Sequence, residues 1–336
     1  MKTVLIDLPL GRECLDRLRA MDGVRVRMVG DLQGGSVPAK ELVEEANVLL
    51  CDALPPTFPA MTSLELIQLG SSGYSQLFDR GLAERRIRAC NARGVFDVPI
   101  AEWNIAMMVN LTRNLRELVR NQDAAVWDRD ARFQRELRGA VVGIWGYGGI
   151  GRETARLAKA LGLTVHVCVR ASVRPRENVY VVPGTGDVPG TLPDRVFVAG
   201  QELEFLAGLD FLILAMPLSP STDGIVGEAE LQALPRRAFV LNPARGPLIQ
   251  EAALLKALRE AWIAGAALDT HYQYPLPPEH PLWRMPNVIL TPHISGSNQN
   301  QHYLTRIGEL LIENVRRYMS GQPLLNELSP DQLRGL

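Results

Sequence analysis

Three glycines between a strand-like run and a helix-like run have the spacing of a phosphate-binding turn. Gly146, Gly148 and Gly151 follow the apolar run 141–145 as G-x-G-x-x-G, and residues 152–161 suit a helix. In such a turn the first glycine allows the bend, the second lets the backbone approach a pyrophosphate, and the third lets helix and strand pack closely. A further apolar strand, 164–169, follows. The pattern therefore predicts a βαβ dinucleotide-binding unit rather than a glycine-rich surface turn.

The end of this second strand indicates which dinucleotide is bound. NAD sites usually carry an acidic residue there for the ribose hydroxyls, whereas NADP sites offer Arg or Ser to the 2′-phosphate. Here Val169 is followed by Arg170, Ser172 and Arg174. Because a carboxylate repels the extra phosphate and arginine attracts it, these residues favour NADP(H), with NAD(H) still possible. The alternative is that both arginines are merely solvated.

Length and composition favour a two-domain α/β protein, since 336 residues is long for one compact core. With 46% hydrophobic residues, 22% charged residues and a net charge of -1, nothing indicates a nucleic-acid partner or a membrane span. The start, residues 1–7, suits a first strand rather than a signal peptide, so we expect a cytoplasmic protein. Metal-ligand spacing is missing from the four cysteines, so we expect reduced thiols and no metal: Cys14, Cys51, Cys90 and Cys168.

Five strand-like runs in the first hundred residues predict a first α/β unit. They are Val4–Leu8, Val24–Val29, Val48–Cys51, Leu66–Leu69 and Ile87–Cys90. A turn, Ser71–Tyr74, directly follows the fourth run. In an open α/β sheet such a turn lies at the carboxyl end of its strand, where its N–H groups could hold a carboxylate. An ordinary tight turn is equally compatible.

Residues 101–120 carry apolar side chains at intervals of three and four, which predicts one long helix. Its apolar face suits a subunit interface or an intramolecular core. The charged segment 127–139 is expected to be solvated. Residues 175–198 are rich in proline and glycine and predict an extended loop or a β-hairpin insertion.

Strand-like and helix-like runs then alternate to the C-terminus. The predicted strands are 211–215, 238–242, 264–268 and 288–290, and the predicted helices are 201–207, 251–259 and 305–319. We expect the last helix to pack on the first unit. Polar or turn-forming residues follow each strand, which is where ligands bind in such sheets.

The order of motifs resembles the D-isomer-specific 2-hydroxyacid dehydrogenases over nearly the whole chain. The motifs are Ser72-Gly73, residues 95–102 (VFDVPIAE), the glycine triplet, residues 242–246 (NPARG), residues 267–269 (ALD) and residues 291–294 (TPHI). The resemblance implies two Rossmann-like domains and a homodimer. A flavodoxin-like substrate-binding domain would comprise residues 1–98 and 292–336, and the dinucleotide-binding domain, 99–291, would be inserted into it.

The resemblance also implies the residues of the site. Arg245 matches the arginine that binds the carboxylate and carbonyl of the 2-oxo acid, and His293 matches the acid/base. Ser72 and Gly73 would form the carboxylate-binding turn, and Asp269 would contact the nicotinamide side. The expected cofactor-binding residues are Gly146, Gly148, Gly149, Ile150, Gly151, Arg170, Ser172, Arg174, Pro217, Thr222, Asn242, Pro243, Ala244, Asp269 and Gly296.

The chemistry of reduction suits these residue types. Hydride delivery to a 2-oxo group leaves negative charge on its oxygen, so a proton donor is needed, and an imidazolium serves near neutral pH. A guanidinium can hold the planar carboxylate with two hydrogen bonds. Taken singly, His293 is better explained as a buried structural histidine and Arg245 as an ion-pair former. Their joint position after two strands favours catalysis.

One position departs from the family. Tyr274 stands where most members carry a glutamate that bonds the catalytic histidine and keeps it protonated. A phenol can orient an imidazole but brings no charge, so protonated His293 is less favoured here. Glu279 is the nearest downstream acid and could substitute. Formate dehydrogenases of the same superfamily carry a neutral glutamine at this position, so redox activity is compatible with the change.

These observations predict an NADP(H)-preferring reductase that converts a small 2-oxo acid to the D-2-hydroxy acid, with Arg245, His293 and Tyr274 as catalytic residues. One alternative is a non-catalytic, dinucleotide-sensing protein that resembles the C-terminal-binding-protein corepressors. Another is a formate- or phosphite-type dehydrogenase. Retention of both Arg245 and His293 favours an enzyme. No motif fixes the substrate-selecting side chains, which we expect in residues 54–58 and at Tyr272 and Trp283.

Overall fold

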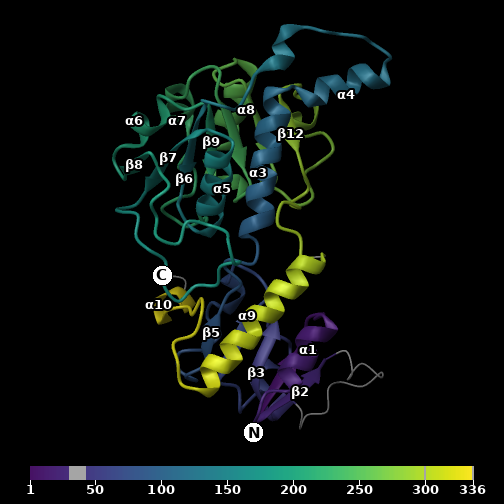
Figure 1. Ribbon diagram of the computed structural model, residues 1–336, viewed down its shortest axis with the longest axis vertical. Helices are drawn as coiled ribbons and strands as arrows, with labels where there is room; N and C mark the ends of the chain where they lie inside the picture. The colour runs from purple at the N-terminus through teal and green to yellow at the C-terminus, as the bar shows by residue number, and fades with distance from the viewer. Residues whose placement is uncertain (30–42, 299, 335–336) are drawn as a thin grey trace. The chain divides into compact units, whose positions relative to one another are not determined.

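The computed structural model describes residues 1–29, 43–298 and 300–334, and the chain divides into two compact units. Unit 1 comprises Met1–Phe96, Glu177–Val182 and Asn298–Leu336, and unit 2 comprises Asp97–Arg176 and Pro183–Ser297. Each is a parallel sheet with helices packed on it (Figure 1), so the predicted α/β class with two Rossmann-like domains is confirmed. The predicted functional domains, 1–98 with 292–336 and 99–291, differ from these units at residues 97–98, 177–182 and 292–297, and they remain a proposal.

Unit 1 is built on a five-stranded parallel sheet with the order β2-β1-β3-β4-β5. This is the strand order of flavodoxin-like folds. The five runs predicted from the sequence are all strands, and only their ends differ. The strands are β1 (Lys2–Ile6), β2 (Val24–Met28), β3 (Ala46–Cys51), β4 (Leu66–Leu69) and β5 (Arg88–Cys90).

Helices cover the sheet of unit 1. The helix α1 (Arg12–Arg19) packs beside α9 (Gln301–Met319), and the short α10 (Pro330–Leu333) follows near the C-terminus (Figure 1). The Asn300 side chain caps α9 by accepting a hydrogen bond from the Tyr303 N–H. The buried face of α9 packs against alternate residues of β1 and β3. The expected closing helix is therefore present and packs on the first unit.

Unit 2 is built on a seven-stranded parallel sheet with the order β12-β11-β10-β9-β6-β7-β8. Its strands are β6 (Val141–Trp145), β7 (Thr164–Val169), β8 (Arg195–Val198), β9 (Phe211–Leu214), β10 (Phe239–Asn242), β11 (Gly265–Leu268) and β12 (Val288–Leu290). From β6 the chain adds β7 and β8 on one side of the sheet and then β9 to β12 on the other, so the topological switch point lies between β6 and β9. In doubly wound sheets ligands bind beyond the carboxyl ends of the strands at such a point.

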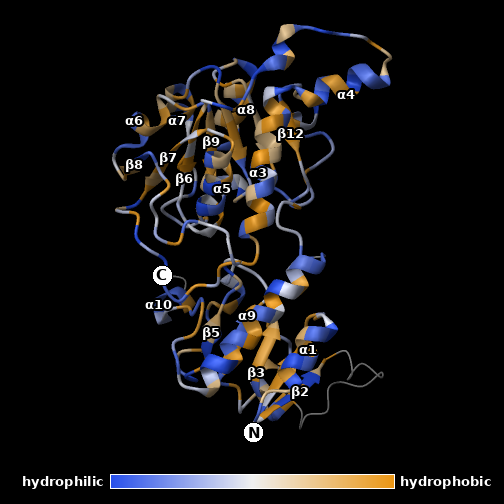
Figure 2. Ribbon diagram, in the orientation of Figure 1, coloured by the Kyte–Doolittle hydropathy of each residue, from blue (hydrophilic) through white to orange (hydrophobic). Residues whose placement is uncertain are grey.

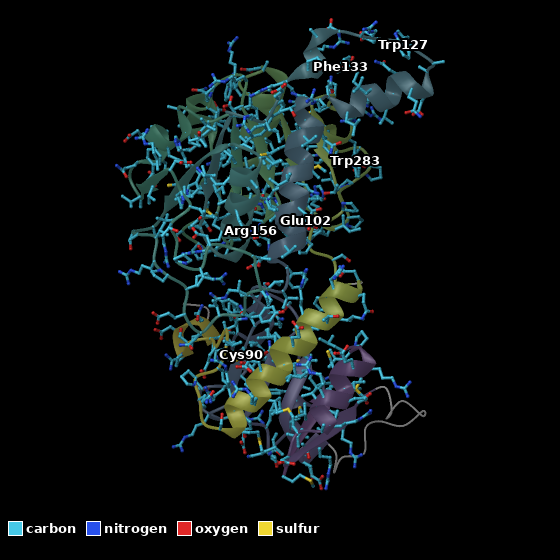
Figure 3. All side chains as sticks on the ribbon, viewed as in Figure 1. Cys90, Glu102, Trp127, Phe133, Arg156 and Trp283 are labelled. Atoms are coloured by element: carbon cyan, nitrogen blue, oxygen red, sulfur yellow. The ribbon has the colours of Figure 1, made fainter. Side chains whose placement is uncertain are left out.

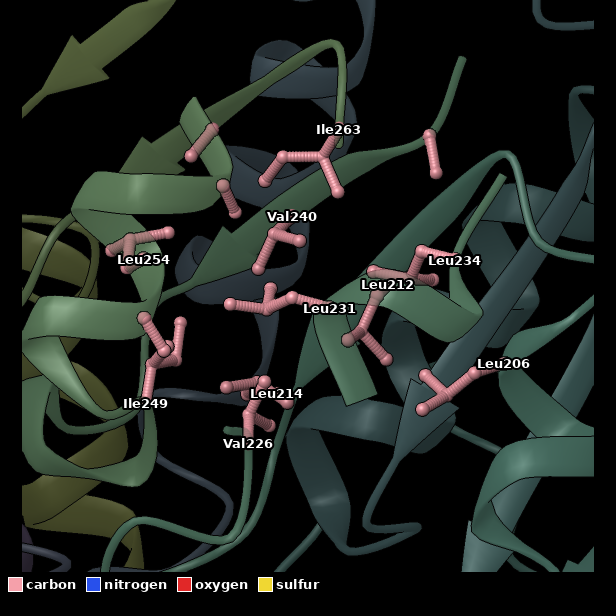
Figure 4. Close-up of a cluster of buried hydrophobic side chains, with 14 of the residues drawn as sticks. Leu206, Leu212, Leu214, Val226, Leu231, Leu234, Val240, Ile249, Leu254 and Ile263 are labelled. Carbon is pink, nitrogen blue, oxygen red and sulfur yellow. The ribbon is translucent and has the colours of Figure 1, made fainter. Parts of the chain in front are cut away.

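The central strands β9, β10 and β11 are buried on both faces, as expected for a parallel sheet. Leu212 and Leu214 of β9 belong to one apolar cluster, drawn in Figure 4, while Phe211 and Ile213 belong to a second cluster on the other face. The hydropathy colouring shows apolar residues concentrated in the strands (Figure 2). The helices of this unit are α3 (Asp97–Thr112), α4 (Leu115–Asp123), α5 (Gly149–Ala160), α6 (Glu202–Leu206), α7 (Glu228–Ala233) and α8 (Glu251–Arg259).

The single helix predicted over 101–120 is wrong, because the structure has two helices there. Between α3 and α4, Asn114 adopts a left-handed backbone conformation with φ 45°. Asparagine tolerates this region better than most residues do, and it interrupts the helical hydrogen-bond ladder. The apolar period runs through both helices, so periodicity alone could not reveal the break.

The proline- and glycine-rich segment is a long loop followed by a parallel strand, so the β-hairpin alternative is wrong. Its last residues form β8, which pairs with β7 in parallel. Within the loop, residues 177–182 pack in unit 1, where Tyr180 is buried and its hydroxyl donates to the Glu309 carboxylate over 2.9 Å. The chain therefore passes from unit 2 to unit 1 and back within this loop.

The helix α4 and the segment after it extend from the rest of unit 2 (Figures 1 and 3). Trp127 is 88% exposed, whereas Phe133 is buried, so the expectation of a solvated 127–139 segment holds only in part. None of the described helices is long and apolar enough to cross a membrane.

Candidate active site

The glycine turn connects β6 to α5 and leaves open space where a dinucleotide phosphate would lie. Gly146 has φ 99°, and a Cβ there would meet the Ala215 carbonyl. A Cβ on Gly151 would lie 2.5 Å from the Gly146 oxygen, so this residue must stay small for helix and strand to pack. At Gly148, the exposed N-cap of α5, a Cβ would meet nothing within 4 Å. The residues present therefore fit a dinucleotide, since backbone N–H groups at a helix start bind phosphate.

The end of β7 carries basic and hydroxyl side chains, as the sequence indicates. Arg170 is exposed, and its side chain forms no hydrogen bond or ion pair with any described residue. The Arg174 guanidinium donates to the Ser172 hydroxyl over 3.3 Å. Two exposed guanidinium groups at this strand end are compatible with the 2′-phosphate of NADP.

A buried arginine fixes the long loop beside the glycine turn. Arg152, in α5, is only 4% exposed, and its guanidinium donates to the backbone carbonyls of Tyr147, Arg174, Asp187 and Val188. Sequence reasoning missed this residue. Its position one residue after the glycine motif is the only signal that could have pointed to it.

The Asp187 carboxylate organises the same loop. It accepts hydrogen bonds from the backbone N–H groups of Gly190, Thr191 and Leu192, and from the Tyr147 hydroxyl over 2.7 Å. Burial alone would raise the pKa of Asp187, but these hydrogen bonds hold it below its usual value. The loop after β7 is therefore tied to Tyr147, which lies between two glycines of the turn.

The turn after β10 presents Arg245. The buried Asn242 side chain shapes this turn, because its oxygen accepts from the N–H groups of Ala244 and Arg245 and its amide donates to the Arg245 carbonyl. Pro243 lies within the turn. The Arg245 side chain is exposed, its guanidinium donates to the Ala244 carbonyl, and no described carboxylate pairs with it. Its remaining donors are available to an anion.

The loop after β12 presents His293 and is folded around Asp269. The fully buried Asp269 carboxylate, at the end of β11, accepts hydrogen bonds from the Thr291 hydroxyl, the Ile294 N–H, the Ser295 N–H and the Ser295 hydroxyl. His293 has φ 56°, the left-handed region that side-chain-bearing residues rarely adopt. Asp269 therefore holds the loop that carries the predicted acid/base.

Arg245 and Asp269 lie close enough to His293 to shift its pKa, and Tyr274 lies beside its ring. His293 is exposed as a residue, and partial desolvation of its ring is the first cause that lowers its pKa. Arg245 and His271 lower this pKa further, while the Asp269 carboxylate opposes the shift. Asp269 is thus the acid that raises the pKa of His293, and the exposed Glu279, which the sequence offered as a substitute, is not among the groups that shift it.

Tyr274 lies beside His293, and their ring centroids are 5.5 Å apart. Among the described residues no hydrogen bond joins the two side chains. Instead, the Tyr274 hydroxyl accepts a hydrogen bond from the His271 N–H over 3.2 Å. The phenol therefore supplies van der Waals contact to the imidazole, and its hydroxyl is tied to the neighbouring loop.

The remaining predicted cofactor residues of unit 2 lie at the same edge of the sheet. The parallel strands put Pro217 and Thr222 after β9 and Gly296 after β12, while Ile150 lies in the first turn of α5. The Thr222 hydroxyl donates to the Pro217 carbonyl over 2.8 Å and shapes that turn.

The turn Ser71–Tyr74 follows β4 in unit 1. The Asn91 side chain donates to the Ser72 carbonyl, and the Ser71 hydroxyl donates to the Gly73 carbonyl. The backbone N–H groups of Ser72 and Gly73 have no acceptor among the described residues. Two unpaired N–H groups in a partly exposed turn suit the binding of an anion.

The four cysteines lie in the cores and are unpaired. Burial raises the pKa of each thiol, to about 12 for Cys51 and Cys168. Thiols held protonated in this way are poor nucleophiles and poor metal ligands.

Comparison with known proteins identifies the class. The model of the NAD-binding domain of D-isomer-specific 2-hydroxyacid dehydrogenases matches residues 105–295. A glyoxylate reductase of Korarchaeum cryptofilum is 30% identical over 299 residues, which are 85% of this chain and 84% of that protein. The chain therefore belongs to the D-isomer-specific 2-hydroxyacid dehydrogenases and is an NAD(P)-dependent enzyme of that class.

Solved structures agree with this assignment. A D-isomer-specific 2-hydroxyacid dehydrogenase family protein from Aeromonas salmonicida has a TM-score of 0.78 and 25% identity, with 98% of this chain and 99% of that chain covered. A D-isomer-specific 2-hydroxyacid dehydrogenase from Xanthobacter autotrophicus, solved with NADPH and MES, has a TM-score of 0.74 and 25% identity, with 98% and 99% covered. The non-catalytic alternative thus has no support beyond the altered Tyr274 position.

Proposed function

We propose that this protein is an NADP(H)-preferring reductase that converts a small 2-oxo acid to the D-2-hydroxy acid. The observation that carries the proposal is that Arg245, which pairs with no described carboxylate, lies close enough to His293 to lower its pKa, at the carboxyl ends of the strands of unit 2. Glyoxylate and hydroxypyruvate are the substrates to test first, because one similar protein is named glyoxylate reductase and a similar solved structure is named glyoxylate/hydroxypyruvate reductase.

Each side chain has a separate task in the proposed reaction. The bound reduced nicotinamide supplies the hydride. Arg245 holds the carboxylate of the oxo acid through two N–H donors and polarises its carbonyl. His293, in its protonated form, gives a proton to the oxygen on which negative charge develops. Ser72 and Gly73 are assigned a role in carboxylate binding through their backbone N–H groups.

The proposed cofactor preference rests on the end of β7. Arg170 and Arg174 are exposed there, and a carboxylate that would repel a 2′-phosphate is missing from residues 169–176. We expect Arg170→Ala to lower kcat/KM for NADPH by about 10- to 100-fold, the loss of one charge-assisted hydrogen bond, and to leave NADH nearly unchanged.

A nicotinamide-absorbance assay tests the function and the roles together. Glyoxylate, hydroxypyruvate, pyruvate and aryl 2-oxo acids are offered with NADPH or NADH. We expect Arg245→Ala to weaken oxo-acid binding and turnover together, and His293→Ala to remove turnover while NADPH binding stays intact. Near-full turnover by His293→Ala would refute the assigned mechanism. Oxidation of formate or phosphite without any oxo-acid reduction would instead support a formate- or phosphite-type dehydrogenase.

We also propose that the chain forms a homodimer through the α4 region. Leu115, Val119, Val126 and Trp127 expose apolar side chains there. The Arg116 guanidinium donates to the carbonyls of Trp283, Met285 and Val288, so the base of α4 is held firmly. Exposed apolar side chains on a fixed element favour a protein interface. Light scattering on the wild type and Trp127→Asp tests this proposal, and a monomeric wild type would refute it.

A further inference from the structure

His271 touches all three loops that build the catalytic end of the site. Its imidazole Nε2 lies 2.8 Å from the Thr291 carbonyl, two residues before His293. Its backbone N–H donates to the Tyr274 hydroxyl. A Cβ added to Gly246, the neighbour of Arg245, would lie 2.5 Å from the His271 carbonyl, so the two backbones are in close contact.

The backbone of His293 needs support from both sides. A left-handed conformation is unfavourable for a residue with a side chain and persists where its surroundings impose it. On the C-terminal side, Asp269 binds the N–H groups of Ile294 and Ser295. On the N-terminal side, the His271 ring binds the carbonyl of Thr291. These two contacts bracket the predicted proton donor.

Nε2–H is the group through which the His271 ring forms its hydrogen bond. A carbonyl oxygen only accepts hydrogen bonds, so Nε2 must be the protonated nitrogen. The ring is only 7% exposed, and Nδ1 is buried without a hydrogen-bond partner among the described residues. A purely apolar ring would fill the same space without leaving a buried nitrogen unpaired. The donor is therefore the feature that distinguishes histidine from phenylalanine here.

We propose that His271 is a positioning residue that holds the His293 loop in its productive conformation through the Nε2–H bond to Thr291. This inference rests on the proposed oxo-acid reduction for its kinetic consequence. His271 does not itself transfer a proton to substrate. Without the Nε2–H donor, we expect the loop to stay folded around Asp269, but the orientation of the His293 side chain is no longer fixed.

Three substitutions separate the donor from the volume of the ring. Phenylalanine keeps the ring and removes the donor. Glutamine places an amide N–H near the position of Nε2, whereas asparagine is too short to do so. We expect His271→Phe to lower kcat at least about tenfold with the KM for the oxo acid and the Kd for NADPH within about twofold. We expect His271→Gln to return kcat to within about threefold of wild type.

His280 provides a matched control. It lies in the loop that follows, and its Nε2 contacts the Glu251 carboxylate. His280→Gln should keep kcat near the wild-type value. Full kcat in His271→Phe, or equal losses in the Phe and Gln variants, would overturn the inference while leaving the proposed function intact. If His271→Phe does not fold, His271→Asn serves in its place and must show the same loss.

A measurement without turnover keeps the inference independent of the function. Amide NMR spectra of the deuterated protein should show shifts at His293, Ile294 and Ser295 in His271→Phe, and their return toward wild-type positions in His271→Gln. Unchanged amides in His271→Phe would overturn the positioning role. A wild type that reduces no 2-oxo acid would refute the proposed function alone, because the NMR comparison would still decide this one.

Discussion

Two buried carboxylates of unit 2 fold two loops in the same way, one after β7 and one after β12, on different sides of the switch point between β6 and β9. Asp187 binds three backbone N–H groups and the Tyr147 hydroxyl in the loop between β7 and β8. Asp269 binds two backbone N–H groups and two hydroxyls in the loop after β12. The first loop adjoins the glycine turn, and the second carries His293. A buried carboxylate that binds backbone N–H groups therefore shapes the loop at the proposed cofactor site and, separately, the loop that carries the proposed acid/base.

The comparison predicts that the two carboxylates have different kinetic signatures. Asp269→Asn should show the larger effect, because an amide nitrogen would face the N–H groups that fix the His293 loop. We expect kcat to fall about 100-fold, with the Kd for NADPH within about threefold. Stopped-flow turnover and NADPH fluorescence titration measure the two quantities. Normal turnover in this variant would show that the loop does not depend on Asp269.

Asp187→Asn should have the smaller and complementary effect. The loop after β7 would loosen from Tyr147 and Arg152, so the KM for NADPH should rise about tenfold, with kcat within about twofold. Initial-rate kinetics at saturating oxo acid measure both. A fall in kcat without a change in the KM for NADPH would show that the two loops are not separate in function.

The smallest effect concerns pH. Because the pKa of His293 is held below its ordinary value, the protonated form is lost on the acidic side of neutrality, and the rate of reduction should fall as pH rises through that pKa. Tyr274→Glu adds a negative charge beside the imidazole, since the two rings are 5.5 Å apart. The Tyr274→Glu substitution should move this fall in the rate of reduction to higher pH by about 1–3 pH units.

Profiles of kcat/KM against pH for the two proteins test this shift. Deuterated NADPH establishes that hydride transfer limits the rate in both. Tyr274→Phe is the matched control, because it removes the hydroxyl without adding charge and should keep the wild-type profile. Superimposable profiles for Tyr274→Glu and the wild type would mean that a carboxylate at this position does not reach His293.

The sequence predicted the parts of the fold that depend on local pattern. Alternating apolar runs gave every strand of unit 1, and the glycine spacing located the turn before α5. The break at Asn114 was missed because apolar periodicity continues through it. β8 was missed because it follows a proline- and glycine-rich stretch, where propensity favours a turn.

In the candidate site too, some residues could be predicted from sequence pattern and others could not. Arg245 and His293 could be predicted as catalytic because motif and chemistry agree on them, and their roles stay predictions. Arg152 and His271 were missed, since each binds a backbone carbonyl that is distant in the sequence. Asp187 was missed because no motif marks its local turn and its distant partner is the Tyr147 hydroxyl. A hydrogen bond between a side chain and a remote carbonyl leaves no periodic or spacing signal. Such supporting contacts become visible only when the loops are seen together.

Transfer of deuterium to a chiral product tests the central claim most directly. The wild type is incubated with hydroxypyruvate and NADPH deuterated at C4 of the nicotinamide, and the product is analysed by chiral chromatography and mass spectrometry. The account predicts D-glycerate with one deuterium at C2, formed with a kcat/KM for NADPH at least about tenfold above that for NADH. It also predicts that His293→Ala forms almost none. L-glycerate, hydrogen from solvent at C2, or equal use of NADH would contradict it.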